Sequence, residues 1–113
     1  MGRKRVYAPL DVYMNRRHVG QYLRAPDGAF AFTYAADWLA WENRLPISRA
    51  LPLRPERYTG PPVIAVFENL LPDSDDIRRR VAERVGAEGL DAHSLLARIG
   101  RDCVGALQFL PEG

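Results

Sequence analysis

Cysteine and long apolar runs are nearly missing from this chain. Cys103 is the only cysteine among 113 residues, which excludes an internal disulfide and any zinc site built on several thiolates. No apolar run approaches the roughly 18 residues that a membrane-spanning helix needs, and the basic residues 1–5 are not followed by an apolar signal core. These absences predict a cytoplasmic protein without a membrane role.

Lysine is almost absent as well. The chain contains one lysine, Lys4, and fifteen arginines, and its formal net charge is +2. Arginine contacts phosphate or carboxylate through two parallel hydrogen bonds, but a GC-rich genome produces the same bias. We favour the second explanation, because acidic residues interleave with most arginines and because Arg78, Arg79 and Arg80 would point about 100° apart on a helix. A nucleic-acid-binding module stays the rival hypothesis, and direct nucleic-acid binding is not expected.

The motifs of phosphate chemistry are also absent. The sequence has no Gly-x-x-x-x-Gly-Lys-Ser/Thr loop, no His-Arg-Asp triplet and no Asp-Phe-Gly triplet. Asp73, Asp75 and Asp76 crowd together, but they open a predicted helix, where carboxylates offset the helix dipole. A cation site would need further oxygen ligands at set spacing. We therefore expect no catalytic residue, no cofactor, no metal site and no enzymatic activity in this chain.

The first third of the chain alternates as strands do. Leu10, Val12 and Met14 fall on one face, residues 15–18 form a predicted turn, and residues 19–23 return as a second strand. After a turn at Pro-Asp-Gly, a third strand carries the alternating aromatic side chains of Phe30, Phe32 and Tyr34. The pattern predicts an antiparallel meander with one apolar face, and His18 is expected at the surface.

Helices and a proline-rich arm follow. Helices are predicted over residues 36–41, 63–71, 74–85 and 91–99, and a last strand is predicted over residues 104–110. The run of residues 73–76, which contains Ser74, supplies an N-cap oxygen, Gly86 is a natural end of the 74–85 helix, and Asp91 can cap the helix that follows. Prolines make residues 45–62 an ordered arm, with Leu51 and Leu53 as a possible edge strand. Ile77, Val81 and Val85 would form the apolar stripe of the third helix, and His93 is expected at the surface. The predicted fold class is α+β, one domain over residues 1–113: a small antiparallel, partly barrel-like sheet with three to four short helices packed on it.

Three groups of side chains are candidates for contact with a partner. Trp38 and Trp41 lie on one side of a short helix, and each is either core packing or an interface anchor. Glu68 and Asn69 interrupt an apolar segment, so Asn69 either satisfies backbone groups of the arm or faces an adjoining domain together with Glu68. The third group, residues 101–102 (Arg-Asp), either locks local geometry or lets the arginine reach a partner or a phosphate.

Two motifs are informative beyond composition. Residues 66–73 read Val-Phe-Glu-Asn-Leu-Leu-Pro-Asp, and residues 99–106 read Ile-Gly-Arg-Asp-Cys-Val-Gly-Ala. With segments 11–15, 32–39 and 46–53 in the same order, the chain resembles the N-terminal subdomain of the HipA family of bacterial serine/threonine kinases, the toxins of HipBA-type toxin–antitoxin pairs. Arg49, Ala50 and Glu68 depart from residues that are common in the family.

The resemblance implies a function without catalysis. In this family the ATP-binding and catalytic residues lie downstream of the subdomain, so the chain is expected to bind a HipA-type kinase core, either as a separate HipS-like antitoxin or as a fragment of a full-length kinase. A HipB-like DNA-binding antitoxin is a further possible partner. The residues expected to contact the partner are Trp38, Trp41, Ser48, Arg49, Glu68, Asn69, Arg101 and Asp102.

Overall fold

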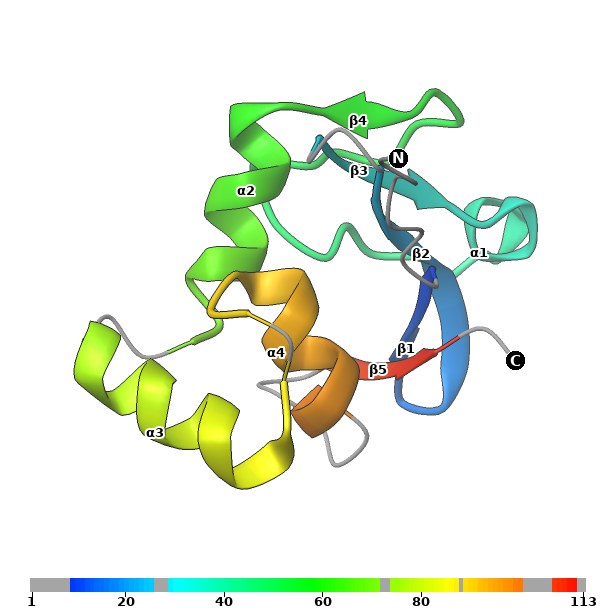
Figure 1. The fold of residues 1–113 in the computed structure, drawn as a ribbon. Helices are drawn as coiled ribbons and strands as arrows, with labels where there is room; N and C mark the ends of the chain where they lie inside the picture. The colour runs from blue at the N-terminus through cyan, green and yellow to red at the C-terminus, as the bar shows by residue number, and fades with distance from the viewer. Residues whose placement is uncertain (1–8, 26–28, 72–73, 88, 101–106, 112–113) are drawn as a thin grey trace, which may run out of the picture.

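The computed structural model describes residues 9–25, 29–71, 74–87, 89–100 and 107–111. Within these ranges an antiparallel sheet is covered by helices, as Figure 1 shows. The strands are β1 (Leu10–Met14), β2 (Arg17–Arg24), β3 (Phe30–Tyr34), β4 (Tyr58–Thr59) and β5 (Leu107–Pro111). The helices are α1 (Ala36–Ala40), α2 (Pro61–Glu68), α3 (Asp75–Val85) and α4 (Ala92–Ile99). The α+β class expected from the sequence is confirmed.

The sheet has the strand order β4-β3-β2-β1-β5, and every pairing is antiparallel. The first three strands form the predicted meander. The last strand returns beside the first, with Val12 opposite Phe109. Because β4 and β5 lie at the two ends of this order, the sheet is open and not closed into a barrel.

The turn between β1 and β2 is shorter than predicted. Asn15 and Arg16 have φ angles of 51° and 67°, and β2 already begins at Arg17. Two left-handed residues in a two-residue loop match the twist of the strands that they join. The prediction of a turn over residues 15–18 was therefore wrong by two residues, because the pattern did not reveal that asparagine and arginine would both adopt positive φ.

Phe67 of α2 packs near the centre of the core. Its ring stacks on Tyr22 of β2, with centroids 4.0 Å apart and planes at 12°, and its edge contacts Phe109 of β5 at 5.9 Å. Leu95 and Leu96 of α4 are buried in the same core. Burying a large apolar side chain stabilises a fold by roughly 1.5 to 3 kcal/mol. The aromatic side chains of the strands thus pack against α2 and α4.

Helix α2 begins earlier than predicted. Pro61 and Pro62 open it and it ends at Glu68, whereas the sequence suggested residues 63–71. Proline suits a first helical turn because the amide hydrogen that it lacks would have no partner inside the helix. The two prolines therefore begin a helix here and do not belong to the extended arm.

The ends of α3 and α4 follow their capping residues. The Ser74 side chain accepts a hydrogen bond from the Ile77 backbone N–H, and Gly86 ends α3 with a φ of 72°. Asp91 caps α4 by accepting from the Ser94 N–H. These caps were predicted, but the apolar stripe of α3 was wrong at Ile77, which is 47% exposed. Ala82 is the buried residue of α3 instead.

Aromatic side chains hold the arm that joins α1 to β4. The Trp38 Nε1–H donates to the Leu45 carbonyl at 3.0 Å, and the Tyr58 hydroxyl donates to the Pro52 carbonyl at 2.6 Å. Leu51 is fully buried but forms only an isolated bridge with Ser48, so the edge strand proposed around Leu51 and Leu53 was wrong. The strand at this edge of the sheet, beside β3, is β4, further along the chain. None of the described helices has the length and apolar character needed to cross a membrane.

Candidate functional site

The two tryptophans of the predicted interface have different environments. Trp38 is 2% exposed and belongs to the core, whereas Trp41 is only partly buried. Their ring centroids lie 5.2 Å apart, and the Arg17 guanidinium lies 3.9 Å above the Trp41 ring. Trp38 therefore packs the core, and Trp41 is the tryptophan that a partner could reach. Its surroundings form a hollow of about 240 Å³ between α1, the β1–β2 turn and the start of the arm.

Ser48 and Arg49 lie further along the arm. The Ser48 hydroxyl accepts a hydrogen bond from the Ala50 backbone N–H at 3.1 Å, so the side chain stabilises a local turn. Arg49 is exposed. Both residues stay candidates for contact, and Ser48 also has this structural role.

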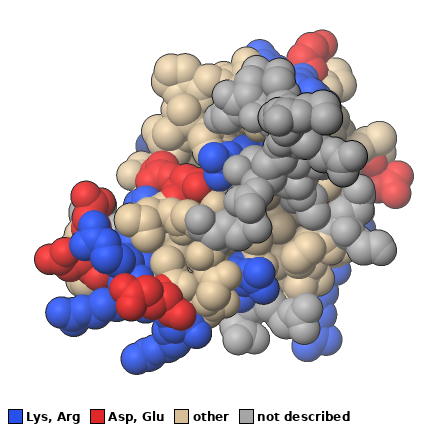
Figure 2. Space-filling model, in the orientation of Figure 1, with Lys and Arg blue, Asp and Glu red and all other residues tan. Residues whose placement is uncertain are grey.

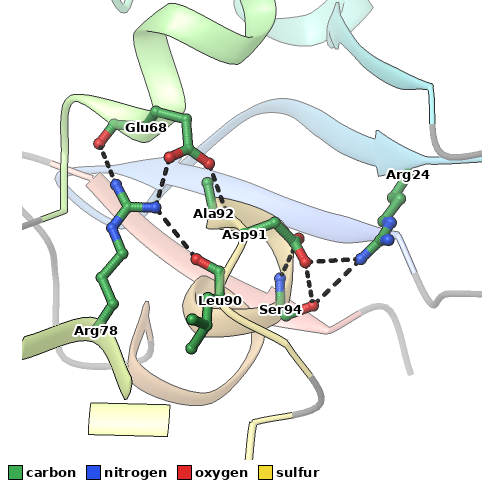
Figure 3. A network of polar contacts seen from close by, with 7 residues as sticks. All are labelled: Arg24, Glu68, Arg78, Leu90, Asp91, Ala92 and Ser94. Carbon is green, nitrogen blue, oxygen red and sulfur yellow. Dashed lines mark hydrogen bonds and ion pairs between the residues drawn. The ribbon is translucent and has the colours of Figure 1, made fainter. Parts of the chain in front are cut away.

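Glu68 connects three helices through its carboxylate (Figure 3). One oxygen accepts from Arg78 of α3 at 2.5 Å, and the other accepts from the backbone N–H of Ala92, the first residue of α4, at 2.9 Å. Arg78 also donates to the carbonyls of Leu90 and Glu68, at 3.1 and 3.3 Å. The Arg78 side chain is 11% exposed and that of Glu68 is 32% exposed. A largely buried ion pair with these additional hydrogen bonds holds the three helices in position.

A second polar cluster adjoins the first and reaches the sheet. Arg24, at the end of β2, donates to Asp91 at 2.8 Å and to the Ser94 hydroxyl at 3.3 Å. The Ser94 hydroxyl in turn donates to Asp91 at 2.8 Å. Figure 3 shows both clusters meeting at the start of α4. Asp91 was predicted as a helix cap, but the ion pair with Arg24 was missed because 67 residues separate the two in sequence.

Asn69 does not have the environment expected for it. It is the exposed C-terminal cap of α2, and its backbone N–H donates to the Ala65 carbonyl at 3.1 Å. The expectation of a buried Asn69 that satisfies backbone groups of the arm is therefore wrong, and the alternative that it faces an adjoining domain stays a prediction. Arg101 and Asp102 lie outside the described residues, and so does Asp73.

His93 was expected at the surface, and this prediction was wrong. It is 2% exposed, and its ring centroid lies 5.1 Å from that of Tyr22. Burial lowers the pKa of His93, although the charge of Asp91 acts in the opposite direction. Burial raises the pKa of Tyr22, and the carboxylates of Asp91 and Glu68 raise it further. These two rings are therefore neutral packing groups at neutral pH.

Tyr34 carries the polar contacts of the arm inside the core. Its hydroxyl donates to the Leu51 carbonyl and accepts from the Ile47 backbone N–H at 3.0 Å. Burial raises the pKa of Tyr34 to about 12, although the hydrogen bond from Ile47 acts in the opposite direction. His18 is on β2 and partly exposed, with Nε2 3.0 Å from the Asp11 carboxylate. No described group of three or more His, Cys, Asp or Glu side chains is arranged to hold a metal ion.

The structure separates the predicted contact residues into two regions. Trp41 and the start of the arm lie beside α1, whereas Glu68 and Asn69 lie at the far end of α2, on the opposite side of the molecule in Figure 1. Figure 2 shows acidic and basic side chains interleaved over α3, so the arginines there form no patch of one sign on this face. The candidate contact residues that the structure describes therefore lie on two surfaces.

Comparison with known proteins gives a consistent result. Residues 10–110 match the family model described as the HipA N-terminal domain. A protein of Sinorhizobium fredii named "Putative kinase Y4mE" is 38% identical over 103 residues, which is 91% of this chain and 24% of that protein. HipA in the Shewanella oneidensis MR-1 complex of HipA, HipB and operator DNA superposes with a TM-score of 0.74 at 27% identity, over 92% of this chain and 24% of that one. The chain thus spans about a quarter of the length of these relatives.

Proposed function

The chain belongs to the HipA N-terminal domain family, and we propose that it is a non-catalytic component of a HipA-type toxin–antitoxin system. In this role it binds a HipA-type serine/threonine kinase core and neutralises or regulates it. The observation that carries the proposal is the match over residues 10–110 to a domain that makes up only 24% of a relative named as a kinase.

The chemistry of the chain supports a binding role. Its sequence lacks the phosphate-loop, His-Arg-Asp and Asp-Phe-Gly motifs, and the described polar network around Glu68 and Asp91 is occupied by contacts among the helices and with β2. Phosphoryl transfer requires groups that hold metal ions and position the phosphates. We infer that such groups reside on the kinase core, and that the chain is not an enzyme by itself.

Two forms of this function are open. The chain acts either as a free-standing antitoxin on a separate kinase or as the N-terminal part of a longer kinase. A HipB-like DNA-binding protein is a further proposed partner, since the Shewanella relative was solved in a complex with HipB and operator DNA. Direct nucleic-acid binding is the less favoured alternative, because Arg78 is engaged with Glu68 and acidic side chains interleave with the neighbouring arginines (Figure 2).

Co-expression tests the antitoxin form. A HipA-type kinase from the same genome, produced without its own N-terminal domain, should arrest growth, and the chain should relieve the arrest. A Phe67→Asp variant is the matched control, because it places a carboxylate in the centre of the core and should neither fold nor relieve the arrest. Arrest that persists in cells containing the soluble, folded chain would contradict neutralisation.

A further inference from the structure

The hollow beside Trp41 has both apolar and polar walls and one charged side chain. Its apolar wall residues are Met14, Trp38, Trp41 and Leu45, and the asparagines Asn15 and Asn43 add polar groups. Leu45 is 59% exposed, so its side chain is accessible to a partner at the hollow. Among the described residues that line the hollow, Arg17 is the only charged one.

The hairpin turn and two hydrogen bonds from side chains to backbone carbonyls shape this hollow without any partner. Asn15 and Arg16 fix the hairpin turn with left-handed backbone angles. The hydrogen bond from Trp38 Nε1 to the Leu45 carbonyl ties the arm to α1 at 3.0 Å, and Arg44 Nη1 donates to the Trp41 carbonyl at 3.1 Å. A preformed hollow binds a side chain without the entropic cost of ordering its own walls.

The position of Arg17 determines what the hollow can bind. Its guanidinium lies 3.9 Å from the Trp41 ring centroid, so the cation is held at the rim by the indole. A guanidinium stacked on an aromatic ring still has N–H donors in its own plane, where they suit the two oxygens of a carboxylate. The hollow therefore combines apolar wall residues with a cation placed over the Trp41 ring.

We propose that this hollow binds an acidic and apolar segment of the kinase polypeptide. One apolar side chain of the segment enters between Trp41 and Leu45, and a neighbouring aspartate or glutamate accepts hydrogen bonds from Arg17. The inference rests on the proposed function, which supplies the partner. The relatives carry about three quarters of their length beyond the part that this chain matches, and the occupant belongs to that part.

The test is the affinity of the full chain for the kinase polypeptide without its N-terminal domain, measured by calorimetry for the wild type and for Arg17→Glu, Arg17→Gln and Arg80→Glu. Arg80 is exposed on α3, so Arg80→Glu makes the same change of charge on a different surface. Arg17→Glu should weaken binding by at least about tenfold and Arg17→Gln by a smaller factor, whereas Arg80→Glu should stay within about twofold of the wild type. Circular dichroism should show that each variant is folded. If Arg17→Glu does not fold, the comparison of Arg17→Gln with the wild type still tests the proposal.

The outcomes separate the two proposals. A wild-type complex that is weakened only by the Arg17 variants supports the inference. Equal affinities for the wild type and the folded Arg17 variants, or equal losses for Arg17→Glu and Arg80→Glu, overturn the hollow as the binding site and leave the proposed function standing. Failure of the wild-type chain to bind the kinase polypeptide overturns the proposed function, and the inference falls with it.

Discussion

Three neighbouring arginines of α3 have different roles because they point in different directions. Arg78 is 11% exposed and bonds Glu68, whereas Arg79 pairs with Asp76 in the solvent and Arg80 is exposed. Consecutive helical residues point about 100° apart, so α3 can direct only one of these three side chains at the α2–α4 junction. The same residue type thus supplies an internal structural contact and two surface charges.

At the residue scale, His93 predicts a pH dependence of stability. Burial lowers its pKa in the folded state, below the value of about 6.5 that it has in the unfolded chain. The unfolded state therefore binds more protons as the pH falls below about 6.5, and the free energy of unfolding should decrease there by at most about 1.4 kcal/mol per pH unit from this one group. Above about pH 7 His93 is neutral in both the folded and the unfolded state, so it no longer lowers the free energy of unfolding.

Urea unfolding at pH values from 8 to 5 measures this effect. A His93→Gln variant removes the titration, so its stability should change less between pH 7 and pH 5 than that of the wild type. It should also be less stable at pH 8, because the contact with the Tyr22 ring is altered. Identical pH slopes for the two proteins would show that His93 is not the responsible group.

The role of a single residue could be predicted from the sequence where the group that it contacts lies close by in the sequence. The caps Ser74 and Asp91 were predicted because a capping side chain bonds an N–H two or three residues later. The roles of Arg78 and His93 were missed because they depend on contacts from α2, the start of α4 and β2, which the fold brings together from distant parts of the sequence. Nothing in the local pattern distinguishes Arg78 from Arg79.

At the scale of elements, the Glu68–Arg78 pair should contribute measurably to stability. Glu68→Gln keeps the shape of the side chain but leaves the Arg78 charge, 11% exposed, without its counter-charge. We expect the free energy of unfolding to fall by about 2 kcal/mol. The matched control is Asp76→Asn, which removes the partner of Arg79 in an exposed pair on the same helix and should cost no more than about 0.5 kcal/mol.

Chemical denaturation of both variants under identical conditions checks this expectation. Equal losses for Glu68→Gln and Asp76→Asn would show that burial of the ion pair does not determine its contribution. Helix α3 should be the most affected element, since Arg78 links it to Glu68 of α2 and to the Leu90 carbonyl just before α4, as Figure 3 shows.

The helices and strands were predicted better than the arm that connects them. Periodicity and turn residues suffice for the β1–β3 meander, and the caps suffice for α3 and α4. The arm between α1 and β4 has no such period. Its course is set by hydrogen bonds from Tyr34, Trp38 and Tyr58 to backbone groups, and these contacts cannot be inferred from local sequence.

At the scale of the whole molecule, the fold places two distinct surfaces far apart. One is the hollow beside Trp41, which has apolar and polar walls and the Arg17 cation over the Trp41 ring. The other is the α2–α3–α4 junction, where the polar groups satisfy one another. The sequence identified residues of both surfaces, but it could not show that they lie on different sides of the molecule. A binding role fits the first surface better, because its side chains retain hydrogen-bonding and apolar capacity for a partner.

The most direct test of the binding role is a calorimetric titration of the purified chain into the HipA-type kinase polypeptide from the same genome, produced without its N-terminal domain. Binding through a preformed surface predicts a saturable complex with a Kd of about 1 µM or tighter. Absence of heat and of co-elution for the two folded proteins at about 100 µM each would contradict the proposal that this chain acts by binding a kinase core.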